Sequence, residues 1–301
     1  MMILSHKSRT LSISLVALLA LGADANLAPG KAFVRKTNPS NILERTKMLK
    51  IRGGGAIPID PTLVAKTGAS IFMAQGSAMN LAPALSNKML NLEETPVNNY
   101  VMRFFGTGVV AISISIYCLL VKNTSLATAS RVQNIVWLIE NIRTLLTGEA
   151  TEVGAANNSG VIINIINCVV MIYATTQDAY SLMAIKISSA FWFAVGLLGI
   201  VDAQAFMKLY GFPDEPLASS TEVITRMLSY SLTAVFTLFG ALAFKFTDDV
   251  LVAIGLAFLN FVVMDLDGMF VRKSVEKNDM SMPRMYFWLI LNSVVAGTLL
   301  S

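Results

Sequence analysis

The chain has 301 residues, of which 54% are hydrophobic and 14% are charged, and its mean hydropathy is +0.62. Soluble domains carry about 25% charged residues, so this composition excludes an ordinary soluble enzyme and predicts a membrane protein. The formal net charge is +4, but nine of the 23 basic residues and only two of the 19 acidic residues precede Gly53. The remaining 14 basic and 17 acidic residues give a net charge of −3, which disfavours nucleic-acid binding.

The residue types that carry most enzyme chemistry are scarce. The one histidine, His6, lies near the N-terminus, so the chain after Gly53 has none. This excludes Ser/His/Asp and Cys/His catalysis, His-ligated haem and His-containing zinc sites from that part. Cys118 and Cys168 are isolated in apolar runs and are interpreted as buried thiols. We therefore predict no catalytic residue, no metal site and no cofactor.

The first 25 residues have the order of a secretory signal peptide. A short segment with Lys7 and Arg9 precedes the apolar run Leu11–Gly22, which is too short to span a bilayer, and small residues follow at Ala23 and Ala25. We predict a signal peptide over 1–25, with 32 as an alternative end. A basic tract that is poor in acidic residues and ends in three glycines follows over 33–55.

This order resembles the bipartite plastid presequences of diatom-type algae, in which a phenylalanine follows the signal-peptide cleavage point and a basic transit tract comes next. Here Ala32 and Phe33 match that junction. The resemblance covers about the first fifty residues and implies a plastid membrane, either thylakoid or inner envelope, reached by the secretory route. The alternative is a protein of the endomembrane system with a basic N-terminal tail.

Eight apolar stretches follow, and a helix that spans a bilayer needs roughly 17 to 25 residues. The sequence therefore predicts an all-α polytopic membrane protein with about eight transmembrane helices. Val250–Met264 is short for a span and is expected to extend outward, and Thr62–Met79 is the least apolar. The stretches are Thr62–Met79, Tyr100–Val121, Ser125–Leu146, Gly160–Thr176, Ser181–Val201, Val223–Phe244, Val250–Met264 and Met285–Leu300.

The stretches form an internal repeat of four helices. At a shift of 120 residues Lys66 meets Lys186, and at a shift of 123 Arg103 meets Arg226. Such identities are informative because charged residues are rare here. We predict two membrane repeats, 56–178 and 179–301. Because each has an even number of helices, both should insert in the same direction, as parallel repeats do.

Each predicted repeat carries a polar segment after its first helix, 80–99 and 202–222, and each segment contains a short stretch that predicts an interfacial helix. The side of the membrane with these segments has nine Lys or Arg residues near helix ends, and the other side has five. By the positive-inside rule, the two ends of the repeated region should lie on the non-cytoplasmic side.

Several polar residues fall inside the predicted spans and form a candidate intramembrane polar site. Lys66 and Lys186 either hold an anion between the repeats or extend their amines to the headgroups, and the second interpretation is favoured for positions near helix ends, as it is for Arg103 and Arg226. The candidate residues are Lys66, Arg131, Glu140, Arg143, Asn164, Asn167, Lys186 and Asn292.

Among these, Glu140 and Arg143 are three residues apart and should pair on one face of the third helix. Arg131 should lie on nearly the opposite side. The charged residues form a site, or else a structural pair or an interfacial helix.

Asn164 and Asn167 share a face of the fourth helix, and Asn292 is their candidate counterpart in the eighth, at a shift of 125. Interhelical hydrogen bonds explain such a stripe. Asp265 and Asp267 lie near a helix end, but no third or fourth oxygen ligand for a divalent cation lies nearby in the sequence.

Three functional classes compete. They are an interaction or assembly module of a plastid membrane, a carrier or channel for a small solute or ion, and a membrane enzyme. All nine prolines lie outside the apolar centres of the spans, whereas many carriers interrupt their helices with Gly or Pro at the substrate site. We therefore expect a non-catalytic protein that binds the lipid bilayer and a larger membrane complex, with a small solute as partner only under the carrier alternative. The paired four-helix units are similar to duplicated DoxX-like membrane proteins, although no motif matches.

Overall fold

The computed structural model describes residues 60–301 together with Met48–Leu49 and Ile57–Pro58. The regular secondary structure of the described part is helical apart from β1 (Met48–Leu49) and β2 (Ile57–Pro58), which pair antiparallel with Met48 opposite Pro58. The predicted signal peptide (1–25, or to 32) and the junction at Phe33 lie outside the described residues. So does the tract 33–55 except for β1.

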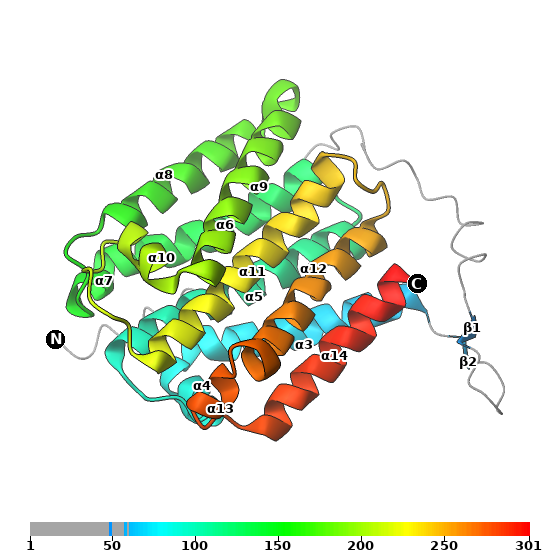
Figure 1. Cartoon of the computed structure of the whole chain (residues 1–301). Helices are drawn as coiled ribbons and strands as arrows, with labels where there is room; N and C mark the ends of the chain where they lie inside the picture. The colour runs from blue at the N-terminus through cyan, green and yellow to red at the C-terminus, as the bar shows by residue number, and fades with distance from the viewer. Residues whose placement is uncertain (1–47, 50–56, 59) are drawn as a thin grey trace.

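Eight long helices coincide with the eight predicted apolar stretches (Figure 1). Their ends are set by proline and by capping side chains. Pro61 and Pro96 occupy the first turns of the first two long helices, and Asp60 and Thr95 accept the backbone N–H groups there. The long helices are α3 (Pro61–Leu81), α5 (Pro96–Leu120), α6 (Leu126–Thr147), α8 (Ser159–Ala174), α9 (Asp178–Val201), α11 (Ser219–Ala243), α12 (Val250–Leu266) and α14 (Met282–Leu300).

Four helical segments are long and apolar enough to cross a membrane: α5, α9, α11 and the segment Val250–Val271. The last joins α12 to η1 (Asp267–Val271), a π-helical turn that extends the short predicted span. The predicted outward extension is therefore confirmed. Helix α8 is apolar but has only 16 residues.

Four short helices complete the fold: α4 (Pro83–Leu90), α7 (Glu149–Glu152), α10 (Ala203–Leu209) and α13 (Ser274–Lys277). α4 and α10 lie in the two polar segments for which the sequence predicts interfacial helices. All four connect long helices at the same end of the bundle, whereas the turns after α5 and α11 at the other end contain no helix (Figure 1).

The bundle is built around α5 and α11, which pack against each other and are almost completely buried. In the first half of the bundle α3 packs on α5, α5 on α6 and α6 on α8. In the second half α9 packs on α11, α11 on α12 and α12 on α14. The halves also meet at their edges, where α14 contacts α3 and α8 contacts α9 (Figure 1).

Small residues let the central helices approach closely. A Cβ atom on Gly76 of α3 would lie 2.7 Å from the carbonyl oxygen of Gly106 in α5, and one on Gly108 of α5 would lie 3.1 Å from Cβ of Ser231 in α11. Without a hydrophobic driving force between helices in lipid, such contacts between small residues are what hold helices together. These glycines therefore set the spacing of the core.

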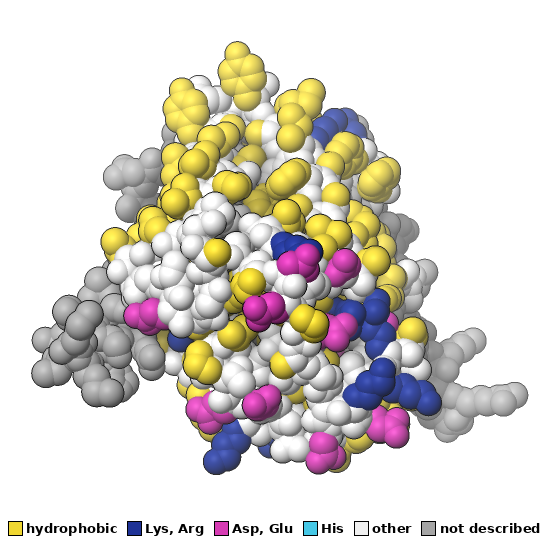
Figure 2. All heavy atoms as spheres, turned by 60° about the vertical axis from the view of Figure 1, so that its left-hand side comes forward, with side chains coloured by type: hydrophobic (Ala, Val, Ile, Leu, Met, Phe, Trp, Pro, Cys, Tyr) yellow, Lys and Arg dark blue, Asp and Glu magenta, His cyan; other side chains and the backbone are white. Residues whose placement is uncertain are grey.

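The outside of the bundle is apolar along α8, α9, α12 and α14. Many of their outward-facing side chains are large and hydrophobic although they are exposed. Figure 2 shows hydrophobic side chains over the upper part of the face drawn, while charged side chains gather on the lower part. A surface of this kind suits the hydrocarbon of a bilayer. The exposed residues include Ile163, Ile166, Val170, Ile187, Phe191, Val263, Ile290 and Val294.

The Gly76 contact predicts the effect of one added methyl group. Gly76→Ala should lower the free energy of unfolding by about 1–3 kcal/mol, because the new Cβ meets the backbone of α5. Thermal unfolding of the detergent-solubilised chain measures this. The control is Gly297→Ala in α14, where no atom lies within 4 Å and the higher helix propensity of alanine should raise stability slightly. Equal effects at the two positions would contradict the close approach.

Candidate functional site

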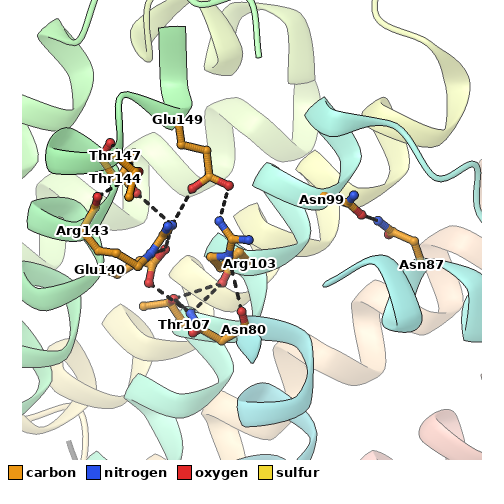
Figure 3. Close-up of polar contacts among 10 residues, drawn as sticks. All are labelled: Asn80, Asn87, Asn99, Arg103, Thr107, Glu140, Arg143, Thr144, Thr147 and Glu149. Atoms are coloured by element: carbon orange, nitrogen blue, oxygen red, sulfur yellow. Dashed lines mark hydrogen bonds and ion pairs between the residues drawn. The ribbon is translucent and has the colours of Figure 1, made fainter. Parts of the chain in front are cut away.

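Three groups of polar side chains in the described bundle are candidates for a functional site. One is a cluster of four charged residues, Arg103, Glu140, Arg143 and Glu149, which we call the charge cluster (Figure 3). The others are two small cavities, each lined by residues of both halves.

The charge cluster forms where α5, α6 and α7 meet. Glu149 of α7 accepts from Arg103 of α5 and, at 2.6 Å, from Arg143 of α6, which also bonds Glu140 at 2.6 Å (Figure 3). Two guanidinium groups and two carboxylates give a net charge of zero. Paired in this way, the four groups can be buried at a tolerable cost.

Asn80 at the end of α3 completes the cluster. Its amide nitrogen donates to Glu140 Oε2 at 3.2 Å and to Thr107 Oγ1 at 2.9 Å, and its backbone carbonyl accepts from Arg103 Nε at 3.3 Å (Figure 3). Three long helices are thus joined at one end by polar contacts.

Glu149 lies in α7, outside the helices that are long and apolar enough to cross a membrane. Burial alone would raise its pKa, but the adjacent Arg103 and Arg143 hold the pKa of this carboxyl below its ordinary value. It is therefore ionised at neutral pH. Because every charge in the cluster is paired with another, no group is left to act on a substrate. The charge cluster is best explained as a structural contact that holds α5, α6 and α7 together.

The first cavity, the Asp265 cavity, lies between α12 and α14 of the second half and α3 and α5 of the first. Asn292 donates to Asp265 Oδ2 at 2.9 Å. The other oxygens of the pair, Asp265 Oδ1 and Asn292 Oδ1, are buried without a hydrogen-bond partner among the described residues. Phe72, Phe261 and Trp288 supply aromatic walls.

The second cavity, the Asn141 cavity, lies between α6 and α8 of the first half and α9, α10 and α11 of the second. Asn164 donates weakly, at 3.4 Å, to Asn141 Oδ1 and to the hydroxyl of Tyr210. Burial raises the pKa of Tyr210 to about 12. The unpartnered atoms here are donors, Gln133 Nε2 and Trp137 Nε1.

The eight residues of the predicted polar site do not come together. Lys66 is exposed, and the amine of Lys186 lies 5.6 Å from the ring centre of Phe244 near the end of α11. Neither lysine reaches the centre of the bundle, so the pair does not hold an anion there. Arg131 donates to the carbonyl of Thr175, well away from Glu140.

Other parts of that prediction agree with the structure. The Glu140–Arg143 pair is confirmed, and Asn164 and Asn167 line one cavity together. Asn292 lies in the other cavity, where it bonds Asp265 as Asn164 bonds Asn141. Asn292 and Asn164 therefore make comparable contacts, and they lie 128 residues apart, whereas the predicted shift of 125 pairs Asn292 with Asn167.

Sequence reasoning missed the partners of these residues. Arg103 was expected to extend to the headgroups, but it is buried because Glu149 approaches from the loop side. Asp265 was considered only with Asp267 as a divalent metal site. In the structure Asp267 bonds Arg272 at 2.9 Å, and Asp265 points into the cavity. An alignment of the third and seventh helices at a shift of 124 pairs Asn141 with Asp265. This alignment was a signal that could have revealed the role of Asp265 in the cavity.

In comparisons with known proteins, no family model, no curated protein and no solved structure matches the chain.

The charge cluster predicts a strong effect of removing one charge. Glu149→Gln should lower the free energy of unfolding by about 2–3 kcal/mol, because it leaves Arg103 and Arg143 with one buried carboxylate between them. Glu152→Gln on the same short helix is the control, since Glu152 is exposed. Chemical unfolding in detergent measures both. Equal stability of the two variants would contradict a structural role for the cluster.

The pKa of Glu149 predicts how that difference depends on pH. Because the folded pKa is depressed, the contribution of the carboxylate is full above its unfolded pKa, near 4.3, and is lost as pH falls through the folded value. The stability gap between the native chain and Glu149→Gln should therefore be constant from pH 7 to 5 and close below pH 4. Unfolding curves recorded across that range measure the gap, and a gap that widens in acid would contradict the assignment.

Proposed function

We propose that all eight long helices cross the membrane as two four-helix units, 56–178 and 179–301, that insert in the same direction. The buried faces of the two first helices support the repeat. Every buried position of α3 has a buried counterpart in α9 exactly 120 residues later. The pairs are Ala65 and Ile185, Gly68 and Ser188, Ala69 and Ser189, Phe72 and Trp192, Gly76 and Gly196, and Met79 and Gly199.

Specific contacts support the same register. Arg103 donates to the carbonyl of Asn80 at 3.3 Å, and Arg226 donates to the carbonyl of Ile200, also at 3.3 Å. The arginines are 123 residues apart and the carbonyl groups 120, which are the two shifts that the sequence predicts. Agreement of contacts, beyond agreement of residue types, favours two copies of one unit.

The seam between α5 and α11 supports the same direction of insertion. Thr221 donates to Asn98 at 2.6 Å, and Gly108 lies against Ser231. Both pairs join residues 123 apart, so equivalent residues meet at two levels of the seam. That pattern is the one expected for a two-fold axis running along the helices, as in parallel repeats. With an axis across the helices, the difference in residue number between contacting residues would change along the seam.

We propose that the chain is a non-catalytic interaction or assembly subunit of a plastid membrane. The observation that carries this role is the polar cap, which we define as the end of the bundle formed by α4, α7, α10 and α13. Hydrogen bonds between the halves tie the cap together, from Asn91 to the carbonyl of Asp279 at 2.6 Å and from Ala156 to that of Gly211 at 2.7 Å.

The surface of the polar cap is charged and acidic. Eight exposed acidic residues and five exposed basic residues lie on the cap, and together they give a net charge of −3. An ordered surface of this kind suits a partner with a basic face, since complementary charge steers and orients association. The exposed charges are Glu93, Glu94, Glu152, Asp202, Asp214, Glu215, Glu276, Asp279, Lys88, Lys208, Lys273, Lys277 and Arg284.

Charge reversal on the cap tests the interaction role. The chain extracted in mild detergent should migrate as part of a complex larger than its own 32.5 kDa. Glu93→Lys with Glu94→Lys should lower the complexed fraction about tenfold, a loss of ~1.4 kcal/mol. Asp248→Lys at the opposite end is the control. A chain that always migrates alone, or equal loss in both variants, would contradict the proposal.

The location is tested separately. Phe33 of the presequence-like segment is the position that the resemblance makes decisive. A fluorescent fusion at the C-terminus should enter the plastid in an algal cell of the diatom type, and deletion of Phe33 should hold it in the endomembrane system. Plastid import without Phe33 would contradict the presequence assignment.

A small-solute or ion carrier is the second candidate function. The observation that favours it is the position of the two cavities, each of which lies between the two proposed units. Solute flux across proteoliposomes would support a carrier, and no flux for any solute would leave the interaction role.

A further inference from the structure

We infer that the Asp265 cavity binds one small monovalent cation. Asp265 and Asn292 are 0% and 1% exposed, and they lie on neighbouring helices, α12 and α14. One hydrogen bond uses Asp265 Oδ2 and the amide nitrogen of Asn292, which leaves Oδ1 of each residue unpartnered in the same cavity. Two free oxygen acceptors, one of them from a carboxylate, form a set that a hard cation or a hydrogen-bond donor would occupy.

The negative charge of Asp265 favours a monovalent cation over a divalent one. Asp265 has no ion pair with any described lysine or arginine, although it lies in a helical segment apolar enough to cross a membrane. An uncompensated carboxylate there is costly. A monovalent cation makes the site neutral, whereas a divalent one would leave a net positive charge. No group of three metal-ligating His, Cys, Asp or Glu side chains occurs in the described part of the chain.

The size of the cavity limits the cation. Its volume is about 20 Å³, which is room for one or two water-sized molecules. Sodium, potassium or ammonium fits, and a bulky cation such as choline does not. Gln75 lines the same cavity as a further oxygen source, and the aromatic side chains of Phe261 and Trp288 also line it.

The Asn141 cavity provides an internal comparison. At the corresponding place between α6 and α8 it has the neutral pair Asn141 and Asn164. Its unpartnered atoms are the donors Gln133 Nε2 and Trp137 Nε1, which repel a cation and suit an acceptor such as a water oxygen. The two cavities therefore differ in the ligand they take. Because similar helix packing accommodates an Asn–Asn pair in the Asn141 cavity, the Asp265→Asn variant should fold.

Thermal unfolding of the full chain in nanodiscs tests the site, with NaCl, KCl or NH₄Cl as ligand and choline chloride at equal ionic strength as reference. At tenfold excess over Kd, at least one small cation should raise the unfolding midpoint by about 4 °C relative to choline. Asp265→Asn should abolish this shift. The matched control, Asp248→Asn in the exposed turn before α12, should keep it.

Two results would overturn the inference. An identical midpoint in all four salts means that the cavity holds water or a protonated carboxyl only, and an equal shift in Asp265→Asn means that the cation binds elsewhere. Neither depends on the interaction role, which the cap variants test. Cation binding together with flux through proteoliposomes would make Asp265 the carrier site, and binding without flux would make the cation a fixed part of the bundle.

Discussion

The close approach of α5 and α11 is the contact on which the rest of the structure depends. These two helices are buried on nearly all sides, and each packs against two long helices of its own half, α3 and α6 for α5 and α9 and α12 for α11. Gly108 is the condition for the contact, because any larger side chain there would meet Ser231. Since this seam is the most extensive contact between the halves, the positions of the outer helices, and so the shape of both cavities, depend on how α5 meets α11.

Several charged side chains of the bundle follow one rule, which is that each lies beside a side chain of opposite charge. The charge cluster balances two arginines with two glutamates, and Arg226 and Arg272 pair with Glu222 and Asp267 in the second half. Asp265 breaks that rule, having an amide as its partner and no cation. Asp265 is 0% exposed and keeps an unpartnered carboxylate oxygen in a cavity, which is why the Asp265 cavity and not the charge cluster carries the ligand inference.

The sequence predicts much of the fold because span length and apolar composition are local properties. All eight long helices, both short helices α4 and α10, and the Glu140–Arg143 pair could be predicted, since each depends on residues close in the chain. The partners across helices could not. Glu149 lies 46 residues from Arg103 and Asn292 lies 27 from Asp265, and which side chains meet depends on the rotation and depth of two packed helices. Periodicity within one helix does not contain that information, although the repeat shift recovers part of it.

Disulfide trapping along the seam tests the central claim, that two copies of one unit meet about an axis parallel to the helices. In a chain with Cys118→Ala and Cys168→Ala, the pair Asn98→Cys with Thr221→Cys should form an intramolecular disulfide in membranes, because the native side chains meet at 2.6 Å. The crossed pair Asn98→Cys with Ser231→Cys should not. Bonding in the crossed pair, with none in the matched pair, would contradict a parallel duplicated bundle.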